Sequence, residues 1–236
     1  MLFFCHLLIG ILIGGIGWQI FHDRRIIPAA AFGAILPDLI DKPLGHIILA
    51  GTLDDGRIYF HGLVVLGIVL VAGLALWYLR HRPEGIALAA GIASHQLADQ
   101  MWLIPVNWYY PFLGPYPHGS YSGYFGSMLI TELTSPTEWL FGAAALLLAI
   151  WYFRGPPRIP ARLLGLFSLV LVLGGTSVFF SGIQGHGNYL MIYSDSISLI
   201  IAGITAFAAG LAVPCTIDIY DDGETHACET SCQVRK

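Results

Sequence analysis

The sequence predicts an all-α protein, a polytopic transmembrane helical bundle of about six or seven membrane segments with no β domain. Of the 236 residues, 56% are hydrophobic and only 11% are charged. A soluble domain carries roughly 25% charged residues, so this chain could not cover a water-facing surface. Its apolar residues also gather in runs close to the roughly 20 residues that a membrane-spanning helix requires. Lipid is therefore part of the solvent in which the chain folds.

The apolar runs follow one another along the chain, and polar or charged residues end each of them. Their expected ranges are 2–20, 26–41, 61–79, 85–104, 137–153, 163–181 and 196–213. The first run has no basic region before it and no small-residue cleavage site after it, so we expect a retained span. The second run is short and contains Pro28 and Pro37. It either crosses the membrane or enters it as a re-entrant or tilted piece.

Polar stretches between and after these runs complete the predicted organisation. Residues 42–59 form a polar connection with a turn signal, and residues 105–136 form an aromatic loop rich in proline and glycine. We expect one transmembrane domain over residues 1–213, whose metal-site half is 1–115. A polar cytoplasmic tail over residues 214–236 is expected to be disordered or loosely packed.

Two of the four cysteines lie in that tail, four residues apart. Cys228 and Cys232 could form a zinc site if Cys215 and His226 supplied the other two ligands. The alternative is a pair of reduced thiols in a polar tail. We favour the second interpretation.

The arginines predict the orientation of the segments, because short loops rich in Lys and Arg stay in the cytoplasm. The arginines of such loops are Arg24, Arg25, Arg80, Arg82, Arg154, Arg158 and Arg162. If residues 26–41 cross the membrane, all of these lie on one side. The prediction is a multi-pass plasma-membrane protein with its N-terminus outside and its C-terminus cytoplasmic. Lys42 and Arg57, on the outer side, are a counter-signal.

Several ionisable side chains lie within or at the ends of the apolar runs, where each costs free energy unless it has a partner or a function. They are His6, Asp38, Asp41, His61, His95 and Asp99. With the orientation taken from the arginines alone, all six fall toward the outer face. The spacings of three and four residues within the Asp38–Asp41 and His95–Asp99 pairs place each pair on one face of a helix.

Three imidazoles and three carboxylates in a medium of low dielectric constant favour a bound cation, since both groups are good ligands for divalent metals. We predict that these six side chains hold one or two divalent ions, with zinc expected. Asp41 or Asp99 could instead serve as a general base. Glu138 is a secondary candidate, although a helix dipole alone favours an acid there. Taken singly, each residue also has a structural explanation, such as a helix cap or an interhelical hydrogen bond.

The order of these residues resembles a known family. Leu36-Pro37-Asp38-Leu39-Ile40-Asp41 resembles the Leu-Pro-Asp-x-(x)-Asp signature of the YdjM-like, membrane-bound metal-dependent hydrolases. The other matching elements are His6-Leu7-Leu8, His61 at the start of a later helix, and Gly91-Ile92-Ala93-Ser94-His95-Gln96-Leu97-Ala98-Asp99. All of them fall within residues 1 to 115, in the family's order. The chain departs at Phe60-His61-Gly62, where the family commonly has Thr-His-Ser.

The resemblance implies metal-dependent hydrolysis at the membrane surface. A more distant similarity to helical zinc-dependent phospholipase C enzymes implies a phosphoester or lipid-linked substrate, with membrane lipid as a partner. The formal net charge of −4 argues against nucleic acid. A metal-ion or proton transporter is an alternative, but it would carry polar groups through the depth of the bundle. A metal-stabilised scaffold is another, and it would have a closed coordination shell.

Overall fold

The computed structural model describes residues 3–117, 119, 124–155, 160–188 and 195–233. For residues 124, 125, 129, 161 and 216–233 it describes the backbone alone. Within these ranges the chain forms helices joined by turns and contains no β-strand, which confirms the predicted fold class. Five described helices are long and apolar enough to cross a membrane. They are α1 (Phe3–Phe21), α3 (Leu63–Arg80), α7 (Pro136–Arg154), α8 (Ala161–Gln184) and α9 (Ser196–Gln233).

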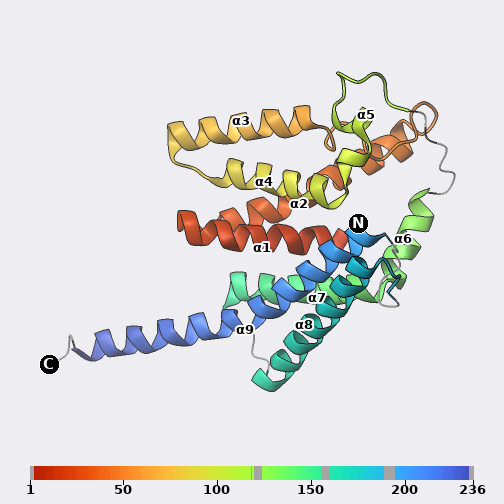
Figure 1. The fold of residues 1–236 in the computed structure, drawn as a ribbon. Coiled ribbons are helices and arrows are strands. Elements are labelled where there is room, and N and C mark those ends of the chain that lie inside the picture. The colour runs from red at the N-terminus through yellow and green to blue at the C-terminus, as the bar shows by residue number, and fades with distance from the viewer. Residues whose placement is uncertain (1–2, 118, 120–123, 156–159, 189–194, 234–236) are drawn as a thin grey trace. The chain divides into compact units, whose positions relative to one another are not determined.

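The chain divides into two compact units, Met1–Trp139 and Leu140–Lys236. In the first unit, α2 (Ile26–Pro43) packs against both α1 and α4 (Glu84–Ala98), and α4 also packs against α3 (Figure 1). The boundary between the units falls within α7, so it does not coincide with the predicted division at residue 213. All the residues of the predicted metal site lie in the first unit.

Helices α2 and α4 occupy the positions of the predicted segments 26–41 and 85–104, but neither meets the length and composition of a membrane span. Helix α2 carries three charged residues near its C-terminus. Helix α4 has 15 residues, or about 22 Å at the rise of an α-helix. Both bury much of their surface against neighbouring helices, whereas Gly73 is the one buried residue of α3 and most of its other residues are exposed. Helices α2 and α4 are therefore the interior of the first unit, and α3 lies at its edge with an apolar surface suited to lipid.

Small residues allow α2 and α4 to pack closely. A Cβ atom at Gly33 would lie 2.2 Å from the carbonyl oxygen of Leu88, and one at Gly91 would lie 2.2 Å from that of Ala30. Small residues at helix interfaces permit the close backbone contact on which association in lipid depends. This proximity brings the side chains of α4 within hydrogen-bond distance of the α2 backbone.

The segments that follow α2 and α4 contain short helices and a backbone turn that the sequence does not predict. The polar connection begins with a short helical turn, η1 (Leu44–Ile48). The predicted run 85–104 is broken, because α4 ends at Ala98 and Gln100 adopts a left-handed backbone conformation with φ of 54°. Two short turns follow, η2 (Met101–Leu103) and α5 (Pro105–Trp108), and α6 (Tyr124–Thr134) occupies part of the predicted aromatic loop.

In the second unit, α8 packs against the N-terminal half of α9. A Cβ atom at Gly175 would lie 2.7 Å from the carbonyl oxygen of Gly203, so this interface also depends on small residues. Helix α9 continues through Pro214 to Gln233, whereas the sequence predicts a loosely packed tail after residue 213. No further proline follows Pro214 to interrupt the helical backbone. The side chains of His226, Cys228 and Cys232 lie outside the described residues.

Candidate metal centre

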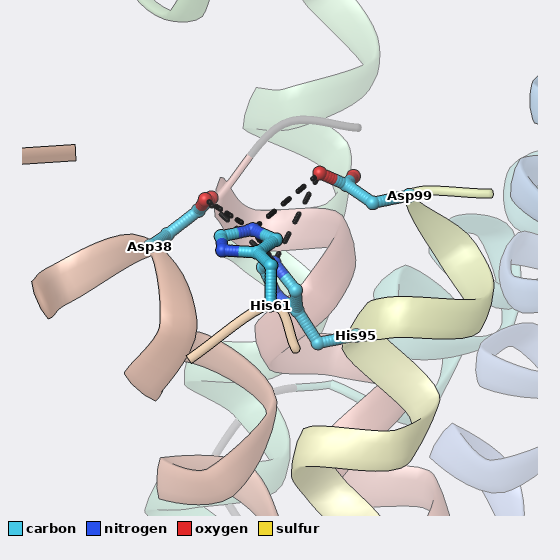
Figure 2. Close-up of side chains that lie close together, drawn as sticks. All are labelled: Asp38, His61, His95 and Asp99. Carbon is cyan, nitrogen blue, oxygen red and sulfur yellow. Dashed lines mark hydrogen bonds and ion pairs between the residues drawn. The ribbon is translucent and has the colours of Figure 1, made fainter. Parts of the chain in front are cut away.

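Four ionisable side chains of the first unit converge on one point (Figure 2). Asp38 comes from α2, His61 from the segment before α3, and His95 and Asp99 from the C-terminal end of α4. Each offers one ligand atom, and these atoms lie within 4.8 Å of one another. None of the four side chains is more than 5% exposed. We call this group the four-ligand cluster.

The two imidazoles of the cluster face each other through their Nε2 atoms, which are 3.1 Å apart. Nδ1 of His95 lies 2.7 Å from the carbonyl oxygen of Ala34, which can only accept a hydrogen bond, so this nitrogen carries the proton. Nδ1 of His61 lies 2.7 Å from Oδ2 of Asp41 and donates in the same way. In neutral imidazoles, both Nε2 atoms then direct lone pairs at each other. A cation between them removes that repulsion.

The two carboxylates complete the cluster. Oδ1 of Asp38 lies 3.6 Å from Nε2 of both His61 and His95, and it is buried without a hydrogen-bond partner. Oδ2 of Asp99 lies 3.9 Å and 4.0 Å from the same two nitrogens. A tetrahedral zinc site with bonds near 2.0–2.1 Å separates its ligand atoms by roughly 3.3 Å. Apart from the 3.1 Å between the two Nε2 atoms, the separations of 3.6–4.0 Å are longer than this value, so the donor set fits a divalent cation if the carboxylates move inward.

Asp41, predicted as a ligand or a general base, lies behind His61. Its Oδ2 accepts hydrogen bonds from Nδ1 of His61 and from the backbone N–H groups of Ile58, Phe60 and His61, at 2.7–3.2 Å. The side chain is fully buried. A carboxylate in this position orients a metal-binding imidazole and raises its basicity. The geometry therefore gives Asp41 a positioning role through His61.

His6, also predicted as a ligand, lies behind Asp99. Its Nε2 is 3.1 Å from Oδ1 of Asp99, and its ring stacks on that of His95 with the centroids 4.0 Å apart. Its Nδ1 is buried without a hydrogen-bond partner. The structure thus brings all six predicted residues together: four form the cluster, and His6 and Asp41 lie one hydrogen bond behind it. Their individual roles as ligands stay predictions.

Two amide side chains that the sequence did not single out hold the segment that carries His61. Gln96 donates hydrogen bonds to the carbonyl oxygens of Phe60 and Gly62, at 3.1 Å and 3.2 Å. Asn107 donates to the carbonyl oxygen of Arg57 at 2.6 Å. Gln96 could have been noticed as a polar residue beside His95 in an apolar run. Asn107 carried no such signal, because it falls in an aromatic stretch.

Glu138, the secondary candidate, contacts the N-terminus of α1 and is not a member of the four-ligand cluster. It accepts a hydrogen bond from the backbone N–H of Phe4 at 2.7 Å, and Glu132 accepts one from that of Phe3 at 2.9 Å. The first N–H groups of a helix have no partner within the helix, and acidic groups are favoured there. The two glutamates therefore anchor the turn of α1 that carries His6.

Comparison with known proteins identifies a family for most of the chain. Residues 1–183 match the model of a family described as YdjM inner membrane protein. This range contains the whole four-ligand cluster and extends well past the motifs, to the end of α8. No curated protein and no solved structure matches the chain.

Proposed function

The chain belongs to the YdjM inner membrane protein family, and we propose that it is a membrane-embedded, metal-dependent hydrolase with its site at the outer membrane face. The observation that carries this proposal is the pair of facing Nε2 atoms of His61 and His95, 3.1 Å apart. In each ring the proton is on Nδ1, so both Nε2 atoms are unprotonated. Oδ1 of Asp38, which has no hydrogen-bond partner, lies beside them. Such an arrangement is costly for the empty chain and favourable around a cation.

His61, His95 and Asp38 would hold the ion, and zinc suits this mixture of imidazole and carboxylate ligands. When bound, such an ion acts as a Lewis acid and activates water near neutral pH. Asp41 and the carbonyl oxygen of Ala34 fix the two imidazoles in the required tautomer. The buried surroundings keep bulk water away from the ligands.

Asp99 is the better placed of the two predicted catalytic carboxylates. Its Oδ2 lies 3.9–4.0 Å from the two Nε2 atoms, farther than the 3.6 Å of Asp38. A carboxylate at this distance can take a proton from a water molecule as a general base. Asp41 is less well placed as a base, because its side chain is fully buried and its Oδ2 already accepts four hydrogen bonds, although its Oδ1 has no hydrogen-bond partner.

A metal-stabilised scaffold is the second candidate, because four protein ligands also make a closed structural zinc site. A transporter is less favoured. Asp38, His95 and Asp99 lie at the C-terminal ends of α2 and α4, and His6 lies near the N-terminus of α1. The cluster is thus concentrated at one end of these helices, whereas a transport pathway requires polar groups through the depth of the bundle.

Metal analysis and hydrolysis assays test the proposal. Purified wild-type protein is expected to bind one equivalent of zinc or more, and His95→Ala and Asp38→Ala are expected to lose it. Phosphoester and carboxylic ester substrates are then assayed with and without a chelator. Asp99→Asn should keep metal but lose hydrolysis if Asp99 is the general base. Metal binding without hydrolysis of any substrate would favour the scaffold, and hydrolysis that is indifferent to chelation would contradict the mechanism.

Labelling tests the outer placement of the site, which rests on the arginine distribution. Phe112 follows α5 in the first unit and is 80% exposed. In a chain whose own cysteines are replaced by serine, Phe112→Cys should react with a membrane-impermeant thiol reagent on intact cells. A cysteine restored at position 215, exposed in α9, should react only after the cells are opened. The reverse pattern would place the site on the cytoplasmic side.

A further inference from the structure

The side chain of Gln96 links α4 directly to the segment that carries His61, and the proposed hydrolysis gives it no role. Its Nε2 donates hydrogen bonds to the carbonyl oxygens of Phe60 and Gly62, at 3.1 Å and 3.2 Å. These two residues precede and follow His61 in the sequence. Gln96 therefore holds the backbone on both sides of one imidazole of the four-ligand cluster, and its neighbour in α4, His95, supplies the other imidazole.

The partners of the Gln96 amide fix its orientation. Its Oε1 accepts a hydrogen bond from the indole Nε1 of Trp108 at 3.0 Å, and an indole N–H can only donate. The carbonyl oxygens of Phe60 and Gly62 can only accept, so they take both hydrogens of the NH2 group. Gln96 is also 1% exposed, so bulk water does not compete for these bonds. The amide therefore has a single favourable orientation.

The backbone around His61 is bonded to two different helices. Asp41 of α2 accepts hydrogen bonds from the N–H groups of Phe60 and His61, at 2.9 Å and 3.0 Å. Gln96 of α4 instead donates to carbonyl oxygens of the same segment. An ionised carboxylate can only accept and an NH2 group can only donate, so neither side chain can replace the other. Loss of the Gln96 amide would leave the segment bonded to α2 and remove these two bonds to α4.

The imidazoles cannot hold this segment against α4 without an ion. Nε2 of His61 lies 3.1 Å from Nε2 of His95, and with both protons on Nδ1 the two lone pairs repel each other. The hydrogen bonds of Gln96 oppose this repulsion. A binding group that is already in position loses less conformational entropy when its ligand arrives. Gln96 can therefore raise the affinity for an ion that it does not contact.

We propose that Gln96 is a positioning residue, which sets the separation of the His61 and His95 imidazoles and so prepares the centre for its ion. This inference rests on the metal centre of the proposed function and adds a residue on which its metal affinity depends. Trp108 takes part indirectly, because its N–H group fixes the amide of Gln96. Neither Gln96 nor Trp108 belongs to the four-ligand cluster, so both act through His61.

Two variants and a matched control test the proposal in the full-length protein. Gln96→Met keeps the length of the side chain and removes the amide, and Trp108→Phe keeps an aromatic ring and removes the N–H group. Gln19→Met is the control, because it changes an exposed glutamine of α1 in the same unit. Each is made in wild-type protein and in His61→Ala protein. Zinc affinity is measured by competition with a chromogenic chelator, on samples that elute as a single species.

The effect of each variant should depend on the presence of His61. In wild-type protein, Gln96→Met should lower zinc affinity about tenfold, at the lower end of the losses typical of an outer-shell change. Trp108→Phe should lower it about threefold, as expected for the loss of one hydrogen bond, and Gln19→Met should not change it. In His61→Ala protein, neither Gln96→Met nor Trp108→Phe should lower the affinity further, because the residue through which they act is absent.

A merely structural role for Gln96 predicts a different result, since a loss of stability would weaken zinc binding whether or not His61 is present. An equal decrease in both backgrounds, or wild-type affinity in Gln96→Met, would overturn the positioning role and leave the hydrolase proposal standing. If Gln96→Met does not fold, Trp108→Phe decides by the same criteria. Wild-type protein that binds no zinc would overturn both proposals.

Discussion

The two units of the chain pack their helices in the same way but bury different polar groups. Helices α2 and α4 of the first unit approach each other at Gly33 and Gly91, and helices α8 and α9 of the second do so at Gly175 and Gly203. In each case a Cβ atom would collide with backbone atoms of the facing helix. Close packing through glycine is therefore common to both units and does not explain the metal centre.

Two buried hydroxyl groups of the second unit donate hydrogen bonds to the main chain. The hydroxyl of Ser168 donates to the carbonyl oxygen of Gly210, and that of Thr205 donates to Ile201 one turn earlier in α9. The first unit instead buries facing lone pairs on His61 and His95. Hydroxyl groups bonded to carbonyl oxygens need no ligand, whereas the imidazole pair could hold a cation together with the two carboxylates. The candidate metal site therefore lies in the first unit.

Removal of one imidazole should give the largest contrast between the units. His61→Ala deletes a proposed ligand, and we expect its zinc affinity to fall by more than about 100-fold, beyond the loss typical of an outer-shell change. Thr205→Val, the matched control in the second unit, should bind zinc as the wild type does. Affinity is measured by competition with a chromogenic chelator, on samples that elute as a single species. Equal zinc affinity in the two variants would contradict the assignment.

Substitution of Asp41, which is hydrogen-bonded to His61, should lower zinc affinity by less than the loss of His61 itself. Asp41→Asn keeps the size of the side chain but weakens its bond to Nδ1 of His61, so zinc affinity should fall about 10- to 100-fold. The same competition assay measures it. A loss as large as that of His61→Ala would indicate that Asp41 itself binds the ion. No loss would remove its positioning role.

The sequence predicted the members of the site better than their roles. His6, Asp38, His61 and His95 stand out because an ionisable group in an apolar segment is costly, whatever the fold. The spacing of Asp38 and Asp41 places both on one helix face, but it does not tell which carboxylate meets the ion. That distinction depends on the backbone N–H groups of Ile58, Phe60 and His61, which donate to Asp41. Contacts of this kind join residues far apart in the chain, so no local sequence pattern predicts them.

The helix boundaries show a similar limit. The apolar run 85–104 predicts one helix, yet α4 ends at Ala98 and Asp99 becomes its C-terminal cap residue. The left-handed conformation of Gln100 turns the chain away. Hydrophobicity continues through this turn: Met101 after it is fully buried, whereas Trp102 and Leu103 are apolar and exposed. Composition therefore predicted the segments that contact lipid or core, and it did not predict where the backbone turns.

Substitutions at the two glycine contacts should destabilise both units, but only the substitution in the first unit should weaken zinc binding. Gly91→Ala and Gly203→Ala each place a methyl group against backbone atoms, and we expect each to lower stability by about 1–3 kcal/mol. Thermal unfolding in detergent measures the loss. Gly91→Ala should also weaken zinc binding, because it moves α4, which carries His95, relative to α2. If Gly203→Ala weakened zinc binding equally, the two units could not be treated as separate.

The smallest effect is expected from a buried hydroxyl of the second unit. Ser168→Ala removes one interhelical hydrogen bond, and bonds of this kind contribute about 0.6 kcal/mol on average in membrane proteins. Thermal unfolding should show a small decrease and metal analysis should show none. A large loss of zinc from Ser168→Ala would mean that the second unit takes part in the site.

X-ray absorption spectroscopy of the zinc-loaded protein tests most directly whether His61 and His95 share a cation. The expected spectrum shows nitrogen and oxygen ligands at about 2.0–2.2 Å, with outer-shell scattering from two imidazoles, and His95→Ala should lose one imidazole or the metal itself. Sulfur ligands at about 2.3 Å would instead place the ion on cysteines such as Cys228 and Cys232. That result would contradict the assignment of the metal centre to the first unit.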